Sequence, residues 1–576
     1  MWKRCSAHMK NIKPFIPNNG SLRRLFRAAI LLWLIGGIAA CFAGCGSSGT
    51  PDATATPIAI PEATVTPLPA QGGTLLLPIS LNPFTLEEGV LEQVAPLAVN
   101  TEEMRNFYSL IYEPLLRCDA ANRLTTSLAE RWSCDDTGLV WTLQLRQGVR
   151  WHAGNGTLSA DDVVYTIEQI RLLGEKSYYY TELEQSVLSC EKVDELTVRV
   201  TMKQKGLCNL YALTFPILCA QGGSSIEGLP LNGTGPYIAQ RFGGVVGQAY
   251  VDLEANQTWW KQSPYITEIR CLARESNSVA LDSYEAGLLN FVPTDSISAG
   301  KYREAEVTNT LDVTTQDAKV LLVNHQNSIL SNSKIRQAII YALDRSAIIS
   351  NVYMNHATVS DVPVPPDSFL YSASSKRFDY DKAAAEALLA QEGWEDLDGD
   401  GVREKNGRKL QFTLLVNDSM ESTNRKNAAA LVETQLEQAG FDIEVVSARY
   451  TLNSTETEFE TKLVNREFDL ALAGFQVGRN GDLSPYLSAG GSRNYGGYTS
   501  QNLNALMSAA AQAGDETAMR ETHGKLQEAF VEELPFIMLY FRLNSLVYST
   551  QIQGVAEVRE PDILRTVERW YMETDG

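Results

Sequence analysis

Three carboxylates at alternate positions are the closest approach to a metal-binding motif in this chain. Asp396, Asp398 and Asp400 are followed by Gly401, as in the first half of an EF-hand calcium loop. Position twelve of such a loop is a bidentate glutamate, but here it is Gly407, so half of the coordination shell is missing. We therefore expect no metal at this turn.

The other side chains that bind metals or catalyse reactions follow no recognised spacing. His152, His325, His356 and His523 are scattered, without a His-Glu-x-x-His pair. The sequence also lacks a Gly-x-Ser-x-Gly nucleophile turn and a phosphate-binding Gly-x-x-x-x-Gly-Lys loop. These absences predict a binding protein without a cofactor rather than an enzyme.

Cys41 and Cys45 end an N-terminal segment, residues 1–45, with the composition of a bacterial lipoprotein signal. Seven Lys and Arg, with no Asp or Glu, precede an uncharged apolar run from Ala28 to Ala40. The run is too short to span a bilayer comfortably, which favours a cleaved signal over an uncleaved anchor. In lipoproteins, a peptidase cuts before the cysteine that becomes acylated.

Either cysteine fits as the acylated residue. Ile38 lies three positions before Cys41, where an aliphatic residue is typical of the cleavage site. Cys45 is followed by the sequence Gly-Ser-Ser-Gly, which suits a flexible tether. We favour Cys45 and keep Cys41 as the alternative. Both predict that the rest of the chain works outside the cytoplasm, held to the cell membrane by lipid.

Residues 46–73 form a linker between the signal and a large folded part. The segment from Thr50 to Ala70 contains five Pro, five Thr and five Ala, and it cannot bury enough surface to offset the entropy of ordering. The remaining part, about 500 residues, exceeds one compact core and predicts two or three lobes. Without the seven signal cations, 42 Lys and Arg face 69 Asp and Glu, a net charge of −27 that argues against a nucleic-acid partner.

Six further cysteines lie in the expected folded part, and their redox state is open. They are Cys118, Cys134, Cys190, Cys208, Cys219 and Cys271. An even number outside the cytoplasm permits disulfides, with Cys118–Cys134 and Cys208–Cys219 as local pairs. The alternative is that they are small buried hydrophobic residues, as free cysteine often is.

Strand and helix patterns alternate along this part. Apolar and polar residues alternate over 141–145, which predicts a half-buried strand. Ser159, with Asp162 three positions later, marks the start of a helix. A second helix over 428–439 should stop at Gly440 and lead into a strand over 441–445. Another strand is expected over 468–475. This alternation predicts α/β lobes with helices packed on sheets.

Short motifs succeed one another in a distinctive order between residues 74 and 560. They are Ile111–Leu115 (IYEPL), Leu128–Trp132 (LAERW), Leu158–Val163 (LSADDV), Gly233–Tyr237 (GTGPY), Trp259-Trp260, Ile335–Ala338 (IRQA), Glu392–Trp394 (EGW) and Glu533–Pro535 (ELP). In this order they resemble the family 5 solute-binding proteins, the peptide- and nickel-binding receptors of ABC importers. Such an ordered series is hard to produce by chance.

The resemblance implies an α/β, bilobal, periplasmic-binding-protein-like fold of the type II, large peptide-receptor class, with an extra N-terminal subdomain. On this basis residues 74–318 and 545–576 form lobe I, with the subdomain inserted at about 105–230. Residues 319–544 form lobe II. A receptor of this kind is a monomer that closes on its cargo and delivers it to two permease subunits and their ATPases.

The resemblance also implies a ligand-binding strip over residues 474–482, Gly-Phe-Gln-Val-Gly-Arg-Asn-Gly-Asp. In peptide receptors of this family the equivalent segment is an exposed strand edge with which the cargo backbone pairs. The expected contacts in the strand itself are Gly474, Phe475, Gln476 and Val477.

The chain departs from the family where an Asp after the aromatic position meets the free amino group of a peptide. Gly478 and Arg479 occupy that place. A guanidinium repels an ammonium and attracts a carboxylate or phosphate, so we expect binding not to depend on a free amine. Asp482 is the alternative amine-binding group, and a solvated loop position is the alternative for Arg479. Tyr108 is the remaining ligand-contact candidate, with a core position as its alternative.

These features favour a lipid-anchored extracytoplasmic receptor that captures peptides or peptide-like solutes for an ABC importer. A surface peptide sensor or chaperone on the same fold is the second hypothesis, and a secreted hydrolase is the third. Neighbouring permease and ATPase genes would favour the first over the second. Turnover of peptides by the pure protein would favour the third.

Overall fold

The computed structural model describes residues 69–79, 95–99, 101–223, 231–244, 249–418, 423–450 and 457–573. The chain divides into two compact units, and all of these residues belong to the second, Leu68–Gly576. The expected export signal, Cys41, Cys45 and most of the linker lie outside the described residues. In the described part, no helix is both long and apolar enough to cross a membrane.

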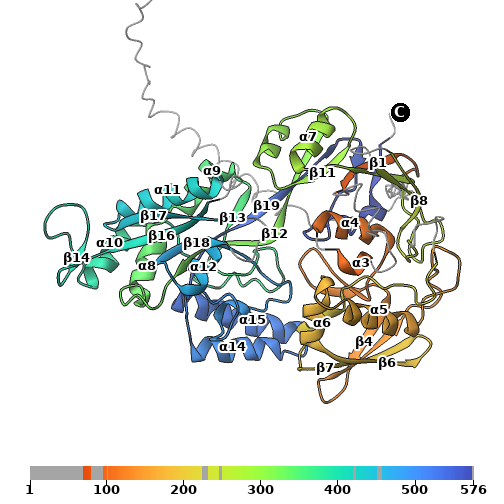
Figure 1. The fold of residues 1–576 in the computed structure, drawn as a ribbon, viewed down its shortest axis with the longest axis horizontal. Coiled ribbons are helices and arrows are strands. Elements are labelled where there is room, and N and C mark those ends of the chain that lie inside the picture. Colours follow the sequence, from red (N-terminus) through yellow and green to blue (C-terminus); the bar gives the residue numbers. More distant parts are fainter. Residues whose placement is uncertain are drawn as a thin grey trace, which may run out of the picture. The chain divides into compact units, whose positions relative to one another are not determined.

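A seven-stranded sheet forms the centre of this unit (Figure 1). Its strand order is β11-β19-β12-β18-β16-β17, with β13 paired to β19. The strands are β11 (Phe291–Thr294), β12 (Thr308–Val323), β13 (Ala357–Val359), β16 (Gln411–Asp418), β17 (Asp442–Arg449), β18 (Leu470–Gln476) and β19 (Ile537–Ser549). The two parallel contacts of β16, with β17 and β18, and the helices beside them make this part an α/β arrangement.

Helices of the second half of the chain accompany this sheet. They are α8 (Ser333–Ala342), α9 (Arg345–Tyr353), α10 (Lys382–Gln391), α11 (Thr423–Glu437), α12 (Glu458–Asn465), α13 (Ser484–Leu487), α14 (Gln501–Ala511) and α15 (Glu516–Glu533). A small hairpin, β14 (Glu404–Lys405) and β15 (Arg408–Lys409), comes after α10. The buried Arg336 guanidinium ties α8 to the end of α15, because it donates to the Leu534 carbonyl at 2.7 Å and to the Leu330 carbonyl at 2.8 Å.

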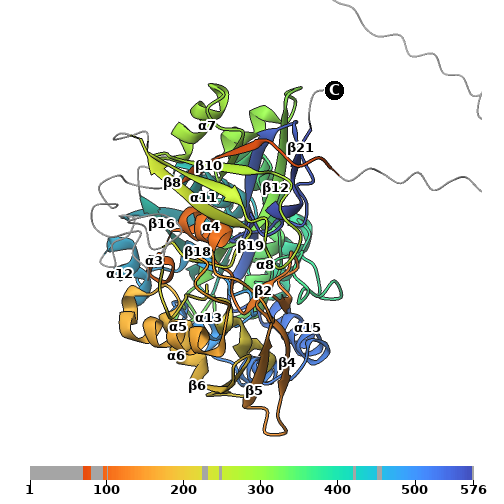
Figure 2. The same ribbon diagram turned by 90° about the vertical axis from the view of Figure 1, so that its right-hand side faces the viewer.

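The first half of the chain contributes two four-stranded sheets. One has the order β1-β10-β9-β8 and the other β4-β5-β7-β6 (Figure 2). Their strands are β1 (Thr74–Ile79), β4 (Ala129–Cys134), β5 (Val140–Leu145), β6 (Val187–Asp194), β7 (Thr197–Met202), β8 (Tyr237–Gly243), β9 (Tyr250–Ala255) and β10 (Glu268–Ala273). Two short pairs complete the set, β2 (Leu116–Cys118) with β3 (Leu124–Thr126) and β20 (Ile552–Gln553) with β21 (Tyr571–Met572).

Short helices connect these sheets. The α-helices are α3 (Ala95–Ala98), α4 (Glu102–Ile111), α5 (Ala160–Leu173), α6 (Tyr180–Ser186) and α7 (Asn277–Glu285). The 3₁₀-helices are η1 (Gly174–Lys176), η2 (Leu207–Leu213), η3 (Ile297–Tyr302) and η4 (Val567–Arg569). Close packing against α4 requires glycine at 233 and 235, because an added Cβ would come within 1.9 Å and 2.7 Å of the Ile111 carbonyl oxygen.

Local sequence signals account for several of these elements. Trp141, Leu143 and Leu145 are buried at alternate positions of β5, as the alternation predicts. The Asp162 carboxylate accepts the Ser159 N–H at 2.8 Å, which satisfies a free donor at the start of α5. The chain leaves α11 through Gly440, whose φ of +97° is a left-handed conformation that favours glycine. These predictions are confirmed.

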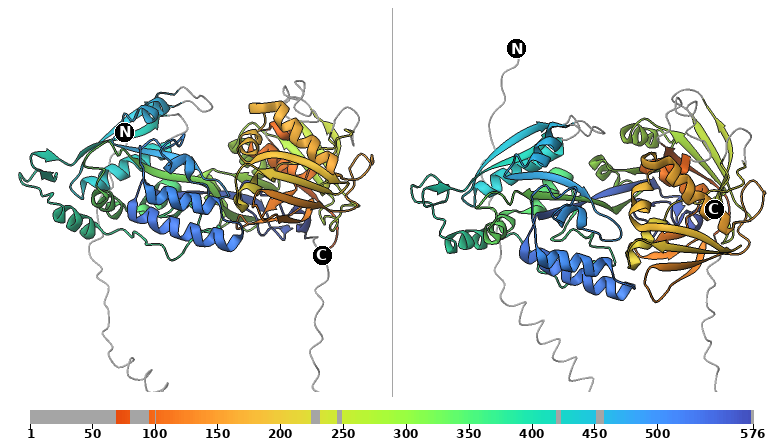
Figure 3. Two further views of the ribbon diagram at one scale, coloured as in Figure 1. Left: turned by 90° about the horizontal axis from the view of Figure 1, so that it is seen from below. Right: turned by 60° about the horizontal axis from the view of Figure 1, so that its bottom comes forward.

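Strands β12 and β19 run between the two halves of the unit (Figure 3). The first part of β12 pairs with the last part of β19, and that part of β19 also pairs with β11. The last part of β12 lies between β18 and the first part of β19 and pairs with both. The ladder is interrupted between Thr314 and Ala318, where the register shifts. The expected lobe boundaries after 318 and 544 fall at this irregularity. The division itself stays a prediction.

Candidate ligand-binding site

A cavity of about 1160 Å³ has walls from both lobes. Helices α4 and α6 and the end of η2 line it from the first half of the chain, while β12, the end of β18 and the loop after β18 line it from the second half. Six of the eight expected contact residues take part in the lining. They are Tyr108, Gln476, Val477, Gly478, Arg479 and Asp482.

The end of β18 has the strand edge that the strip requires. Its antiparallel ladder with β12 continues to Asp317 and Gln476, and the Val477 N–H then donates to the Gln316 carbonyl at 3.0 Å. On the other side, β18 pairs with β16 only at Leu470 and Ala471. Beyond that point the second edge carries no ladder partner among the described residues. It is therefore able to pair with an extended ligand.

Phe475 and Gly474 lie in this strand without lining the cavity. The Phe475 side chain is buried and stacks between Tyr486 and Phe536, with ring centroids 4.3 Å and 5.4 Å away. Its role in the structure is therefore to hold the strand against the core. Gly474 is exposed, and an added Cβ would come within 3.1 Å of the Lys319 ammonium. The Tyr486 hydroxyl donates to the Gln476 carbonyl at 2.6 Å, which already uses part of the edge.

Arg479 reaches from the loop after β18 to lobe I. Its Nη2 donates to the Thr214 hydroxyl at 3.2 Å. Burial by itself would lower the pKa of Arg479, but the Cys118 thiol and the carboxylates of Glu182 and Asp562 together raise it. Acidic side chains of the protein itself therefore stabilise the positive charge of Arg479. It connects the two lobes, and this leaves it less free to select an anionic cargo than its position in the sequence indicates.

Asp482 and Tyr108 are each committed to local structure. One oxygen of Asp482 accepts the Ser484 N–H at 2.8 Å, so this exposed carboxylate supports the start of α13. The Tyr108 side chain is 2 % exposed and lies against the rings of Phe107 and Tyr112, with centroids 5.1 Å and 6.1 Å away. Burial raises the pKa of Tyr108 well above its usual range. Tyr108 therefore combines a core position with one face toward the cavity.

The lobes also touch away from β12 and β19. The Leu207 N–H donates to the Ala513 carbonyl at 2.8 Å, just beyond α14. Gly206 makes this approach possible, because an added Cβ would come within 1.9 Å of the Ala511 carbonyl oxygen. On another side, Arg559 pairs with Asp367 at 2.7 Å. These contacts join the two parts of the fold at two places besides β12 and β19.

A group of cations on lobe II lines the cavity and was not expected from the sequence. Lys319 pairs with Asp317 at 2.5 Å on the face of β12 that lines the cavity. Burial lowers the pKa of Lys319, and the Asp317 carboxylate opposes that shift. Arg542 donates to the Asp295 carbonyl at 3.0 Å and lies 4.6 Å from the Tyr353 ring, with Arg425 also in the wall. The sequence did contain a signal for this group, because the charged residues Asp317 and Lys319 stand at alternate positions of an otherwise buried strand.

The wall is polar throughout its described part. Among the described lining residues, every aromatic side chain is a tyrosine, and Val477 is the only aliphatic one apart from prolines. No His, Cys or Met occurs in this described lining. Gln316, at the irregularity of β12, is 8 % exposed, and neither its amide nitrogen nor its amide oxygen has a hydrogen-bond partner in the described structure. A buried amide of this kind calls for a ligand or solvent partner.

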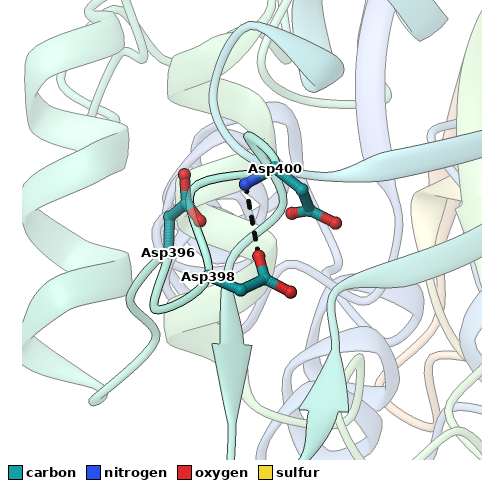
Figure 4. A group of neighbouring side chains, drawn as sticks. All are labelled: Asp396, Asp398 and Asp400. Atoms are coloured by element: carbon teal, nitrogen blue, oxygen red, sulfur yellow. Dashed lines mark hydrogen bonds between the residues drawn. The ribbon is translucent and has the colours of Figure 1, made fainter.

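The Asp396, Asp398 and Asp400 turn does not line this cavity, and a lysine contacts two of its three carboxylates. All three side chains are exposed and point toward a common region (Figure 4). The Lys409 ammonium contacts both Asp398, at 3.0 Å, and Asp400, and these contacts raise the pKa of Lys409. Main-chain N–H groups of Gly399 and Gly401 donate to Asp396 at 2.8 Å and 3.1 Å. The turn is therefore stable without an ion.

The remaining candidate groups do not assemble into a site. All six cysteines of the described part are free thiols, so neither local disulfide is present, and only Cys118, Cys219 and Cys271 are the buried residues that the alternative expected. His152 and His325 are each bound to a main-chain carbonyl, at 3.0 Å from Gly235 and 2.7 Å from Pro535. In both, burial lowers the pKa to about 4.

Two α/β lobes joined by strands, with a cavity between them, define a bilobal binding protein of the periplasmic type. The model of the bacterial extracellular solute-binding proteins, family 5, matches residues 123–497, more than half of the chain. The chain belongs to this family.

Relatives with known names support the assignment. Oligopeptide-binding protein AppA of Bacillus subtilis (strain 168) is 26% identical over 490 residues, covering 81% of this chain and 86% of AppA. Heme-binding protein A of Haemophilus influenzae (strain ATCC 51907 / DSM 11121 / KW20 / Rd) is 21% identical over 465 residues, covering 75% and 81%. The structure of HbpA2 from Haemophilus parasuis matches with a TM-score of 0.72 at 22% identity, covering 87% of this chain and all of HbpA2. That likeness shows the fold.

Proposed function

We propose that this protein captures peptides or peptide-like zwitterions and delivers them to an ABC importer. The observation that carries this proposal is the wall of the cavity, in which both signs of charge surround a free strand edge. A strand edge binds any peptide backbone through main-chain hydrogen bonds. Charged groups of both signs suit a cargo that has an amine and a carboxylate. The unpartnered Gln316 amide adds a donor and an acceptor for a polar ligand.

The same wall argues against the other cargoes of the family. A haem ligand needs a large apolar surface, whereas the described lining has Val477, a few prolines and the rings of tyrosines, each of which carries a hydroxyl. Nickel bound directly by the protein prefers imidazole or thiolate ligands, which the described lining lacks, whereas a nickel chelate would bring its own ligands. At about 1160 Å³ the cavity exceeds the roughly 300–1000 Å³ of a typical small-molecule pocket, so a cargo of several residues fits it.

Binding would work by closure about β12 and β19. Cargo contacts both lobes, so it stabilises the arrangement in which Arg479 meets Thr214. Permease subunits, driven by their ATPases, would dock on that closed form. On this scheme residues 74–318 and 545–576 move as lobe I against residues 319–544, and the chain acts as a monomer without catalysis. A peptide sensor or chaperone on the same fold would close in the same way but would not support uptake.

The experiment is to identify what the protein holds. Native mass spectrometry of gently purified protein should detect bound peptides, and calorimetry with tripeptide pools should show saturable binding without turnover. Recovery of haem or a nickel chelate instead, or no peptide binding, would refute the proposal. Uptake of the same peptides by cells, lost on deletion of the gene, separates the importer from the sensor. Cleavage of peptides by pure protein would favour the hydrolase.

Lipid anchoring is part of the proposal and has its own test. Because Cys41 and Cys45 each fit the acylated position, the double change Cys41→Ser, Cys45→Ser should abolish lipid labelling and release the protein from the membrane. The single variants identify the residue that is used. If the double variant still fractionates as an integral membrane protein, the segment is an uncleaved anchor.

A further inference from the structure

A side pocket of about 150 Å³ adjoins the cargo cavity on lobe I. Five residues line both spaces, and they are Glu102, Asn106, Asp295, Asn544 and Glu560. The inner walls of the side pocket are buried apolar side chains, among them Leu77, Phe107, Phe291 and Ile563. An apolar cavity of this volume holds a group about the size of benzene. The pocket therefore combines an apolar interior with a polar mouth.

Two carboxyl groups dominate the mouth. Glu560 is 5 % exposed; its Oε1 accepts the Asn544 amide at 3.1 Å, and its Oε2 is buried without a hydrogen-bond donor among the described residues. Glu102, in the first turn of α4, lies beside it. Burial, hydrogen bonding between the two carboxyl groups and the charge of Glu102 raise the pKa of Glu560 well above its usual range. The pair is held close at an electrostatic cost.

Among the described residues, no cation pairs with these two carboxyl groups. No ion pair joins Glu102 or Glu560 to a Lys, Arg or His of the described part. Arg542, which also lines the cavity, donates to the main-chain oxygen of Asp295 instead, and the Asp295 carboxylate accepts the Asn277 amide at 2.6 Å. Buried carboxyl groups are normally paired or hydrogen-bonded. An unpaired oxygen that lines a ligand cavity is complementary to a positively charged group of the ligand.

We propose that Glu102 and Glu560 bind the terminal ammonium of the cargo, and that the side pocket receives the side chain of the same residue. This inference rests on the proposed peptide-binding function and deepens it. An ammonium has three donors, which the free oxygen of Glu560 and the Glu102 carboxylate accept. The apolar walls then favour a first residue with a medium-sized aliphatic or aromatic side chain.

An ammonium site at Glu102 and Glu560 would explain why the strip over residues 474–482 lacks the amine-binding Asp of the family. Gly478 and Arg479 stand where an amine-binding carboxylate is expected, and Arg479 is engaged by Thr214 and by acids of lobe I. With the ammonium held on lobe I, the strip on lobe II needs no carboxylate. The proposal replaces the expectation that binding is indifferent to a free amine, and it assigns the role to Glu102 and Glu560 rather than to Asp482.

The test is calorimetry with tripeptide pools Leu-Xaa-Xaa, with free or acetylated N-termini, on the whole folded protein. Acetylation should weaken binding to the wild type by roughly 30- to 1000-fold, as expected when a buried charged contact is lost. Glu560→Gln, which keeps shape and the Asn544 contact, should lose a similar factor for free peptides and little for acetylated ones. Asp482→Asn is the matched control and should retain the full preference for the free amine.

Further comparisons distinguish failure of this inference from failure of the proposed peptide-binding function. Equal binding of free and acetylated pools by the wild type would overturn the inference but leave the peptide receptor intact, whereas no binding of either pool would refute both. An equal loss for both pools in Glu560→Gln would mean a structural role only. Glu102→Gln, on the less buried member, gives the same test if Glu560→Gln fails to fold. Pools with Gly or Trp at the first position should bind at least about tenfold more weakly than Leu pools if the side pocket is used.

Discussion

Two groups of acids in this protein have similar charge but opposite surroundings. Asp396, Asp398 and Asp400 lie exposed on a turn, where the Lys409 ammonium and main-chain N–H groups satisfy them. Glu102 and Glu560 lie at the mouth of an apolar side pocket and have no cationic partner in the described protein. The first group forms a compact motif in the sequence. The second is visible only in three dimensions.

The difference shows why burial and partners decide what a carboxylate does. In water, the exposed aspartates are screened and cost little to hold together. In the low dielectric beside the cavity, the two glutamates repel one another and one is pushed toward its protonated form. Such strain destabilises the unliganded fold and is relieved by a bound cation. The exposed turn has nothing comparable to offer a ligand.

The largest expected effect concerns the stability of the unliganded protein. Because the pKa of Glu560 is raised in the fold, its contribution to stability is present below its ordinary pKa and is lost as the pH rises. Glu560→Gln removes this loss, so it should raise the free energy of unfolding at pH 8 by about 1–3 kcal/mol, with a smaller gain at pH 5. Urea unfolding of the wild type and the variant at pH 8 and pH 5 measures the gain in unfolding free energy at each pH.

The matching change in the exposed group is the control. Asp398→Asn should change the free energy of unfolding less than Glu560→Gln does, because an exposed ion pair such as that of Asp398 with Lys409 contributes little. If Glu560→Gln instead destabilises the protein at pH 8, the Glu560 carboxylate must have a stabilising partner in the protein without cargo. The contrast between the two acidic groups would then fail.

A smaller effect should appear when both glutamates are changed. Either Glu102→Gln or Glu560→Gln removes the repulsion between the two carboxylates, so the second change adds little. The combined gain in unfolding free energy at pH 8 should fall short of the sum of the single gains by at least about 0.5 kcal/mol. Strict additivity in this double-mutant cycle would mean that the two groups do not interact.

The sequence predicted the features of this fold that depend on short-range signals. The strand around Trp141, the helix after Ser159 and the turn at Gly440 are each determined by neighbouring residues, and all three are confirmed. The family motifs correctly predicted a bilobal α/β fold, because the positions that pack the core recur in a fixed order. The strand edge near Val477 was also located in this way.

The side-chain environment of the cavity was out of reach of such reasoning. Glu102 and Glu560 are far apart in the chain, and nothing near either residue indicates that they meet. From its neighbours Arg479 could be an anion-binding cation or a solvated loop residue, and neither alternative indicated its contact with the distant Thr214. At the Asp396–Asp400 turn the expectation of no metal came from the missing acid at Gly407, and the contacts of Lys409 with Asp398 and Asp400 were not part of that reasoning. Local patterns identify elements, whereas charge balance depends on distant contacts.

The smallest expected effect tests the exposed group directly. Since Lys409 occupies the space between Asp398 and Asp400, millimolar calcium and excess chelator should give the wild type the same melting temperature. Lys409→Met removes the ammonium and leaves three carboxylates whose oxygens lie within 4.8 Å of one another. This variant should gain a weak calcium-dependent rise in melting temperature, since an ion bound only by the native state stabilises it. A rise of several degrees in the wild type, abolished by Asp398→Ala, would show instead that calcium displaces the lysine. The exposed acids would then also bind a cation, as is proposed for the buried ones.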